Sequence, residues 1–167
     1  MDRDLPASTT TLREVFASNV EHCVRGRGLG RARLARLAGL SRSHTQAVLT
    51  ARRSVGIDRA ARVAWALEAP CADLVDRDVR PPLTCMSRDT PEDLRWVLAA
   101  NIRALALEAH GEICVATLAK IVGWHRSRVY GVLKREVDLS IDKLEPLAKG
   151  LGTTPAGLLR PRPERSR

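Results

Sequence analysis

Two arginine–serine pairs, Arg42-Ser43 and Arg126-Ser127, carry the clearest binding chemistry in this chain of 167 residues. A guanidinium is a planar fork of donors that can bind a phosphate, or two neighbouring acceptors on the edge of a base, through paired hydrogen bonds. The serine hydroxyl adds one donor and further acceptor capacity. The same pattern of apolar residues surrounds both pairs. We therefore expect the same chemistry twice.

The two pairs lie inside a longer internal repeat. Residues 34–75 align without a gap on residues 118–159, and 13 of the 42 aligned positions are identical. Because these identities fall where helix packing restricts the residue type, we interpret the repeat as a duplication. Among them are Leu34/Leu118, Ala35/Ala119, Gly39/Gly123, Ile57/Ile141, Asp58/Asp142 and Leu67/Leu151.

Each repeat predicts two helices joined by a tight turn. In the first repeat Leu34, Leu37 and Ala38 share one face at helical spacing. Gly39 can take the left-handed conformation that ends many helices, and Ser41 is a good N-cap for the next helix. The arginine–serine pair then occupies the first turn of that second helix.

The second helix of each unit is expected over residues 42–49 and 126–133. A small alanine stands in each repeat where the two helices would cross, at Ala35 and Ala119. Two helices, a glycine turn and a basic outer face together form a helix–turn–helix. The inward residues of the second helices would be Thr45, Val48 and Leu49, and Val129, Val132 and Leu133.

Both units resemble the lambda-repressor-like helix–turn–helix domain of bacterial and phage regulators, also called the XRE family. The shared pattern is Leu-Ala-x-x-x-Gly-hydrophobic-Ser-x-x-x-hydrophobic-x-x-hydrophobic, followed by a loop and two more helices, and it covers about four fifths of the chain. The resemblance implies an all-α fold of two tandem five-helix domains. It also implies a transcription regulator, most simply a repressor, that binds double-stranded DNA. Four residues depart from the family pattern: His125 and Pro70 at helix caps, and Val115 and Ala116 at the helix start where the family often has a polar residue that reaches a phosphate.

The resemblance also implies which residues contact DNA. The second helix of each unit would enter a major groove by its N-terminal end, where arginine suits guanine O6 and N7. Ala47 and Gly131 are too short to hydrogen-bond a base, so few residues would carry specificity. The expected contacts are Arg31, Ser41, Arg42, Ser43, His44, Gln46, Ala47, Arg52 and Arg53 in the first repeat, and His125, Arg126, Ser127, Arg128, Tyr130, Gly131, Lys134 and Arg135 in the second.

Composition narrows the class of partner. The formal net charge of +9 and the sequence pI of about 10.4 suit a polyanion. Aromatic residues make up only 3%, which leaves no stacking platform for single strands or unpaired RNA bases. Duplex DNA therefore fits better than single-stranded nucleic acid.

Other functional classes lack the residues they would need. The four cysteines have no metal-ligand spacing, and the four histidines lack a partnered nucleophile. We therefore expect no metal, no cofactor and no enzymatic activity. The chain shows neither a signal peptide nor an apolar run long enough for a membrane span, so we expect a cytoplasmic, nucleoid-associated protein.

Capping signals place the domain boundaries at residues 10–75 and 90–160, with a linker over 76–89. A capping box opens the first domain at Thr11, and Thr90 followed by proline opens the second. The Pro81-Pro82 pair and mixed charge predict an extended, semi-rigid spacer between independently folding domains. In the first domain, Trp65 and Leu67 are expected in the core.

Two other interpretations of the repeat stay open. In an antitoxin-like regulator, one domain would bind DNA while the other mediates homodimerisation or holds a protein partner. An adaptor that lost its DNA contacts should instead expose apolar side chains where these second helices start, and those residues are Arg, Ser and His. If both domains bind DNA, one chain could occupy a bipartite operator with two related, non-identical half-sites.

Overall fold

The computed structural model describes residues 10–81 and 90–162, and within them the chain is helical throughout, with no named strand. The predicted all-α class is confirmed. The predicted linker residues 82–89 lie outside the described residues.

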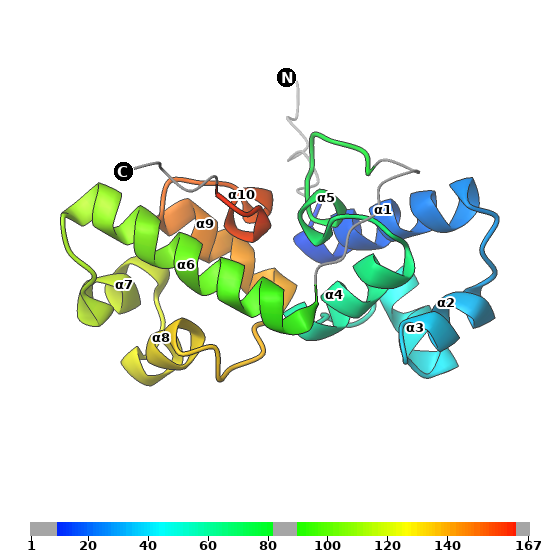
Figure 1. Ribbon diagram of the computed structural model, residues 1–167, viewed down its shortest axis with the longest axis horizontal. Coiled ribbons are helices and arrows are strands. Elements are labelled where there is room, and N and C mark those ends of the chain that lie inside the picture. Colours follow the sequence, from blue (N-terminus) through cyan, green and yellow to red (C-terminus); the bar gives the residue numbers. More distant parts are fainter. Residues whose placement is uncertain (1–9, 82–89, 163–167) are drawn as a thin grey trace, which may run out of the picture.

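The first half of the chain forms five helices (Figure 1). Their bounds are α1 (Leu12–Gly26), α2 (Arg31–Leu37), α3 (Arg42–Leu49), α4 (Ile57–Ala66) and α5 (Cys71–Leu74). The start of α1 follows the predicted capping box, because the backbone N–H of Thr11 donates to the Glu14 carboxylate at 2.7 Å.

The second half repeats this order of helices. Its elements are α6 (Pro91–His110), α7 (Val115–Val122), α8 (Arg126–Leu133), the 3₁₀ turn η1 (Ile141–Lys143), α9 (Leu144–Gly150) and α10 (Pro155–Leu159). The Thr90 side chain accepts from the Asp93 N–H at 3.2 Å at the start of α6, and the Thr154 side chain accepts from the Gly157 N–H at 3.0 Å at the start of α10. The start of α6 therefore lies where the predicted cap at Thr90 placed it.

The turn inside each helix pair has the predicted geometry. Gly39 and Gly123 have φ values of +63° and +65°, in the left-handed region that disfavours other residues. Ala35 and Ala119 are buried, on helices that pack against α3 and α8 respectively. The small alanine side chain lets the two backbones approach, so the tight turn can form.

A buried asparagine ties the first helix of each half to its last. The Nδ2 atom of Asn19 donates to the backbone carbonyls of Asp73, Leu74 and Asp76 at 3.0–3.3 Å. The same contact recurs in the second half, where Asn101 takes the place of Asn19. Its Nδ2 atom donates to the carbonyls of Gly157, Leu158 and Arg160 at 2.9–3.3 Å.

The two halves pack directly on each other. Helix α4 lies against α6 and α5 against α10, and buried apolar side chains from both halves form one continuous cluster. In the described part of the predicted spacer, residues 77–80 are exposed. Pro81 is buried, and Arg77 donates to Glu145 of the other half at 2.6 Å.

One predicted core position is wrong. Trp65 is 54% exposed, because the buried stripe of α4 is made by Ala60, Ala61, Val63 and Ala64 and leaves position 65 facing outward. Leu37 is 38% exposed, since only Leu34 and Ala35 are buried within the short helix α2. Leu67 is buried as predicted.

Candidate nucleic-acid interface

Helix α3 presents a polar N-terminal end to solvent. Ser41 is the N-cap, and its Oγ atom accepts from the backbone N–H of His44 at 3.2 Å. The Ser41 and Ser43 hydroxyls lie 3.1 Å apart, and both residues are exposed together with Arg42. Because Thr45, Val48 and Leu49 are buried, the opposite face of α3 is fixed in the core. The predicted contact residues at this end are thus held on a rigid helix.

Helix α2 adds basic side chains beside α3. Arg31 donates from Nη1 to the Gln46 Oε1 atom at 3.1 Å, so the structure joins two residues that the sequence predicted separately. Arg33 and Arg36, together with Arg42, line a shallow groove between α2 and the start of α3. Arg33 and Arg36 were not predicted as contacts. The sequence could have indicated them, because helical spacing puts Arg33 and Arg36 on the face of α2 opposite the buried Leu34 and Ala35.

His44 is less exposed than Arg42, Ser43 and Gln46 on α3. It is half-buried, and its Nε2 atom has no hydrogen-bond partner among the described residues. Burial lowers the pKa of this imidazole, and the positive charges of Arg59 and Arg53 lower it further. Both effects favour the neutral form of the ring. Arg52 and Arg53 themselves are exposed in the loop after α3.

Helix α8 begins with an arginine–serine pair, as α3 does, but its N-cap residue is His125 instead of a serine. The His125 Nδ1 atom lies 2.8 Å from the Ser127 hydroxyl and accepts weakly from the Ser127 N–H at 3.4 Å. An imidazole thus replaces the usual hydroxyl at the start of this helix. Arg126 and Ser127 are exposed, as Arg42 and Ser43 are on α3.

Two aromatic rings hold cations on the outer side of α8. The Arg128 guanidinium lies 5.4 Å from the centre of the Trp124 ring, and the Lys134 ammonium lies 4.5 Å from the centre of the Tyr130 ring. A hydrogen bond with the Tyr130 side chain also raises the pKa of Lys134. Tyr130 is half-exposed, so the pair remains accessible.

Gly131 does not lie on the exposed face. It is buried, and a Cβ atom there would approach the Val137 side chain to 2.5 Å. This glycine therefore makes room for the loop after α8 rather than offering surface to a ligand. Arg135 is exposed in that loop, and its carbonyl accepts from Arg95 at 3.0 Å. Ala47, the counterpart of Gly131 on α3, is half-buried.

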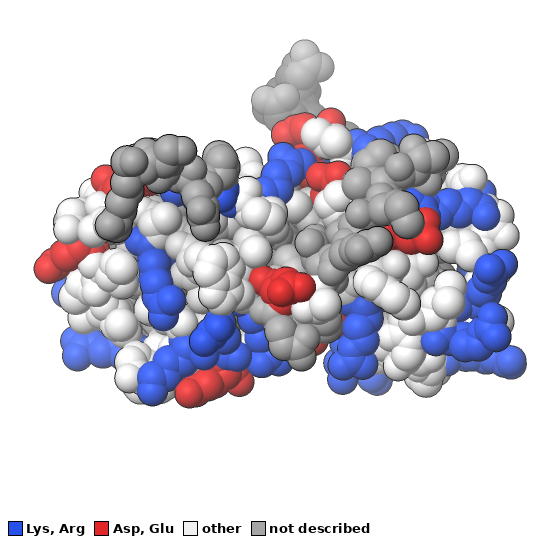
Figure 2. All heavy atoms as spheres, viewed as in Figure 1, with Lys and Arg blue, Asp and Glu red and all other residues white. Residues whose placement is uncertain are grey.

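The two helix–turn–helix units lie on the same side of the molecule, with α3 and α8 at the lower edge of Figure 1. Lysine and arginine side chains gather along this edge in Figure 2, and acidic atoms interrupt them on the α8 side. Glu136 and Asp138 are exposed in the loop after α8, where the first half has Arg52 and Ser54. The basic surface is thus more continuous over the first half.

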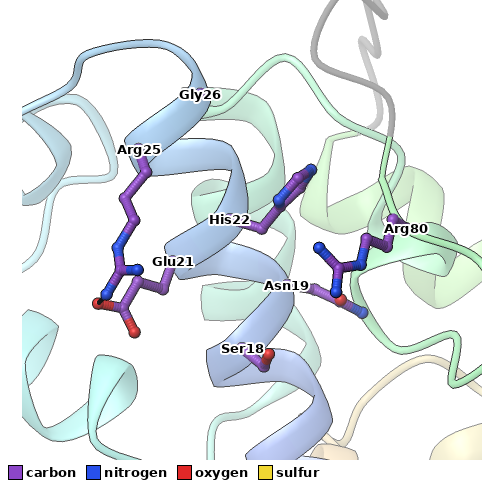
Figure 3. Close-up of a pocket in the computed structure, with 7 residues that line it drawn as sticks. All are labelled: Ser18, Asn19, Glu21, His22, Arg25, Gly26 and Arg80. Atoms are coloured by element: carbon purple, nitrogen blue, oxygen red, sulfur yellow. Dashed lines mark hydrogen bonds and ion pairs between the residues drawn. The ribbon is translucent and has the colours of Figure 1, made fainter.

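A separate polar hollow lies beside α1. His22 and Arg80 point toward each other across it, and Arg25 pairs with Glu21 at 2.7 Å (Figure 3). The Asn19 side chain at its floor is engaged by the backbone that follows α5. The hollow is therefore distinct from the surface formed by α2, α3 and α8.

Metal-binding clusters and membrane-spanning helices are both absent from the described part of the chain. No group of three or more His, Cys, Asp or Glu side chains there could hold a metal ion. Among the helices of residues 10–81 and 90–162, none is both long and apolar enough to span a membrane.

Comparison with known proteins gives one similar solved structure and no family. No family model matches the chain, and no curated protein matches it. The similar structure is described as a hypothetical transcription factor, NHTF, from Neisseria. It is 33% identical, with a TM-score of 0.40, and the match covers 44% of this chain and 82% of that one.

Proposed function

We propose that this protein is a sequence-specific, double-stranded DNA-binding transcription regulator that represses by occupying a bipartite operator. In this proposal, each half is a five-helix domain of the lambda-repressor-like class. The N-terminal ends of α3 and α8 enter major grooves, where Arg42 and Arg126 bind guanine edges. The function is binding rather than catalysis, and the partner is duplex DNA.

One observation carries the proposal: two exposed arginine–serine pairs start two helices on the same basic side of one molecule. The rest of each helix is anchored by buried residues, so the polar ends are preorganised. Arg33, Arg36 and Arg31 on α2, and Arg52 and Arg53 after α3, are placed to bind the flanking phosphates. Gly131 is left out of the proposed contacts because it is buried.

A second candidate keeps DNA binding in the first half and gives the second half a protein partner. The observation that favours it is the apolar ring of Tyr130, which is half-exposed on α8 where the first half has Gln46. In that case only α3 would contact DNA, and α8 would form a protein interface.

Selection from a random duplex library with the full-length protein tests the proposal. We expect an enriched motif that contains guanine, and we expect the Arg42→Ala/Arg126→Ala double variant to bind it at least about 30-fold more weakly, because two base contacts of about 1–3 kcal/mol each are lost. The Arg25→Ala/Arg80→Ala double variant is the matched control, since it removes the same two positive charges beside the separate α1 hollow.

The outcomes separate the candidates. No enrichment, or equal losses for the control and the double variant, would contradict sequence-specific binding. A motif that responds to Arg42→Ala but not to Arg126→Ala would support the candidate in which the second half binds a protein.

A further inference from the structure

The contact between the halves exchanges the same hydrogen bonds in both directions. The Ile57 N–H donates to the Leu139 carbonyl at 2.8 Å, and the Ile141 N–H donates to the Val55 carbonyl at 2.8 Å. In the aligned repeats, Leu139 and Ile141 are the counterparts of Val55 and Ile57. Such a reciprocal exchange is the mark of an isologous interface, in which one surface patch pairs with its own copy across a two-fold axis.

Two pairs of residues locate this axis, because a residue that contacts its own counterpart must lie on it. Gly56 and its counterpart Ser140 form an isolated antiparallel bridge. Arg160 is the counterpart of Asp76 when the alignment is continued by one position, and these two residues form an ion pair at 2.9 Å. The pseudo-two-fold axis therefore passes through both pairs.

Ion pairs away from the axis obey the same relation. Arg13 binds Asp142 at 3.3 Å, and Arg95 binds Asp58 through its Nε atom at 2.7 Å. Arg95 is the counterpart of Arg13, because it precedes Asn101 by six residues as Arg13 precedes Asn19, and Asp142 is the counterpart of Asp58. The backbone hydrogen bonds and the ion pairs are thus related by the same pseudo-two-fold axis.

The axis fixes how α3 and α8 face a common partner. In Figure 1, α5 and α10 lie at the upper edge, whereas α3 and α8 lie on either side at the lower edge. A two-fold rotation reverses the direction of one helix relative to the other along that edge. Duplex DNA has local two-fold axes of its own, so two units related in this way match an inverted rather than a direct repeat.

Charge near the axis favours the pairing of unlike halves. Arg160 binds Asp73 at 2.8 Å as well as Asp76. If two first halves paired by the same symmetry, Asp76 would face the Asp76 of the other copy. If two second halves paired, Arg160 would face Arg160. Like charges oppose both arrangements, so the interface is specific for one first half and one second half.

We propose that one chain binds one operator that is an inverted repeat of two unequal half-sites, with α3 on one and α8 on the other. The inference rests on the proposed DNA-binding function and adds the orientation of the half-sites and the stoichiometry. The half-sites differ because Gln46, Thr50 and Arg52 on the α3 side become Tyr130, Lys134 and Glu136 on the α8 side.

The test uses the full-length protein and duplexes built from its selected sequence. One duplex keeps the selected order, a second inverts one half-site so that the repeat becomes direct, and a third replaces one half-site by random sequence. We expect the direct repeat to bind at least about 100-fold more weakly, because several base pairs become mismatched, and no better than the third duplex. Native mass spectrometry of the selected complex should give one chain per duplex.

Arg42→Ala and Arg126→Ala assign the half-sites within the same experiment. We expect each to relax base preference in a different half-site. Equal binding of inverted and direct repeats, or two chains on one duplex, would overturn the inference while leaving sequence-specific binding intact. Failure to select any motif would instead contradict the proposed function itself.

Discussion

The two halves have the same buried and turn-forming contacts, but they differ in the exposed residues that would contact a ligand. The buried asparagines, the left-handed glycines and the reciprocal ion pairs recur at equivalent places. Beside α3, Arg31 donates to Gln46, whereas beside α8 the Trp124 and Tyr130 rings hold the Arg128 and Lys134 cations. The basic loop after α3 is matched by a loop with Glu136 and Asp138.

This contrast separates positions that the fold constrains from exposed positions that it does not. Positions that close a turn, cap a helix or bridge the halves tolerate few residue types, because their geometry is shared by both halves. Exposed positions on α3 and α8 have no such limit, so they could diverge. The comparison therefore predicts equal structural effects and unequal binding effects for matched substitutions.

The largest effect should come from the buried asparagines. Asn19→Leu and Asn101→Leu each leave three backbone carbonyls without their shared donor, and each should lower the free energy of unfolding by about 2–4 kcal/mol. Urea unfolding measures both, with the exposed Ser18→Ala as control. Clearly unequal losses would break the structural equivalence of the halves.

The base contacts should give the next effect and separate the halves. Arg42→Ala and Arg126→Ala should each weaken binding to the selected duplex by about 1–3 kcal/mol and relax preference at a single base pair. Binding assays on single-base variants of the duplex check this. A uniform loss over all sequences would show that these arginines bind phosphate rather than bases.

The ion pair near the axis should contribute less. Arg160→Glu places a third negative charge beside Asp73 and Asp76 and should lower the free energy of unfolding by about 1–2 kcal/mol. Arg162→Glu breaks one exposed ion pair, with Glu108 at 3.0 Å, and should lower it by less than about 1 kcal/mol. Adding Asp76→Arg to Arg160→Glu should recover part of the loss, and no recovery would argue against specific pairing.

Substitutions in the loops after α3 and α8 should change the salt dependence of DNA binding. Arg52→Ala should weaken binding to all sequences and reduce the slope of log affinity against log salt by about 0.9. Glu136→Arg makes the second loop resemble the first and should steepen the slope by about 0.9 if that loop also lies along phosphates. An unchanged slope for Glu136→Arg would show that the second loop stays away from DNA.

The smallest effect concerns His44 and pH. Burial lowers the pKa of His44 in the folded protein, whereas the unfolded chain keeps the ordinary histidine pKa of about 6.5. Below that pH the unfolded chain therefore binds more protons than the folded protein. Stability should therefore fall as pH drops through that value. His44→Gln should reduce the difference in unfolding free energy between pH 7.5 and pH 5. An unchanged difference would place the acid sensitivity elsewhere.

Local sequence determined the helices and their turns. The bounds of α3 and α8, the caps at Ser41 and Thr90, and the left-handed Gly39 and Gly123 all follow from residues within one or two turns of each other. Such signals suffice because capping and apolar spacing act between positions three or four residues apart. The repeat itself then predicted which features would occur twice.

Tertiary structure decided everything that depends on partners far along the chain. The burial of Gly131 depends on where the next loop folds back. The exposure of Trp65 depends on which stripe of α4 the other helices cover. The pseudo-two-fold axis, and with it the orientation of α3 relative to α8, is set by contacts between equivalent residues of the two halves. No local periodicity encodes such contacts, because they form only when two already folded surfaces meet and their charges match.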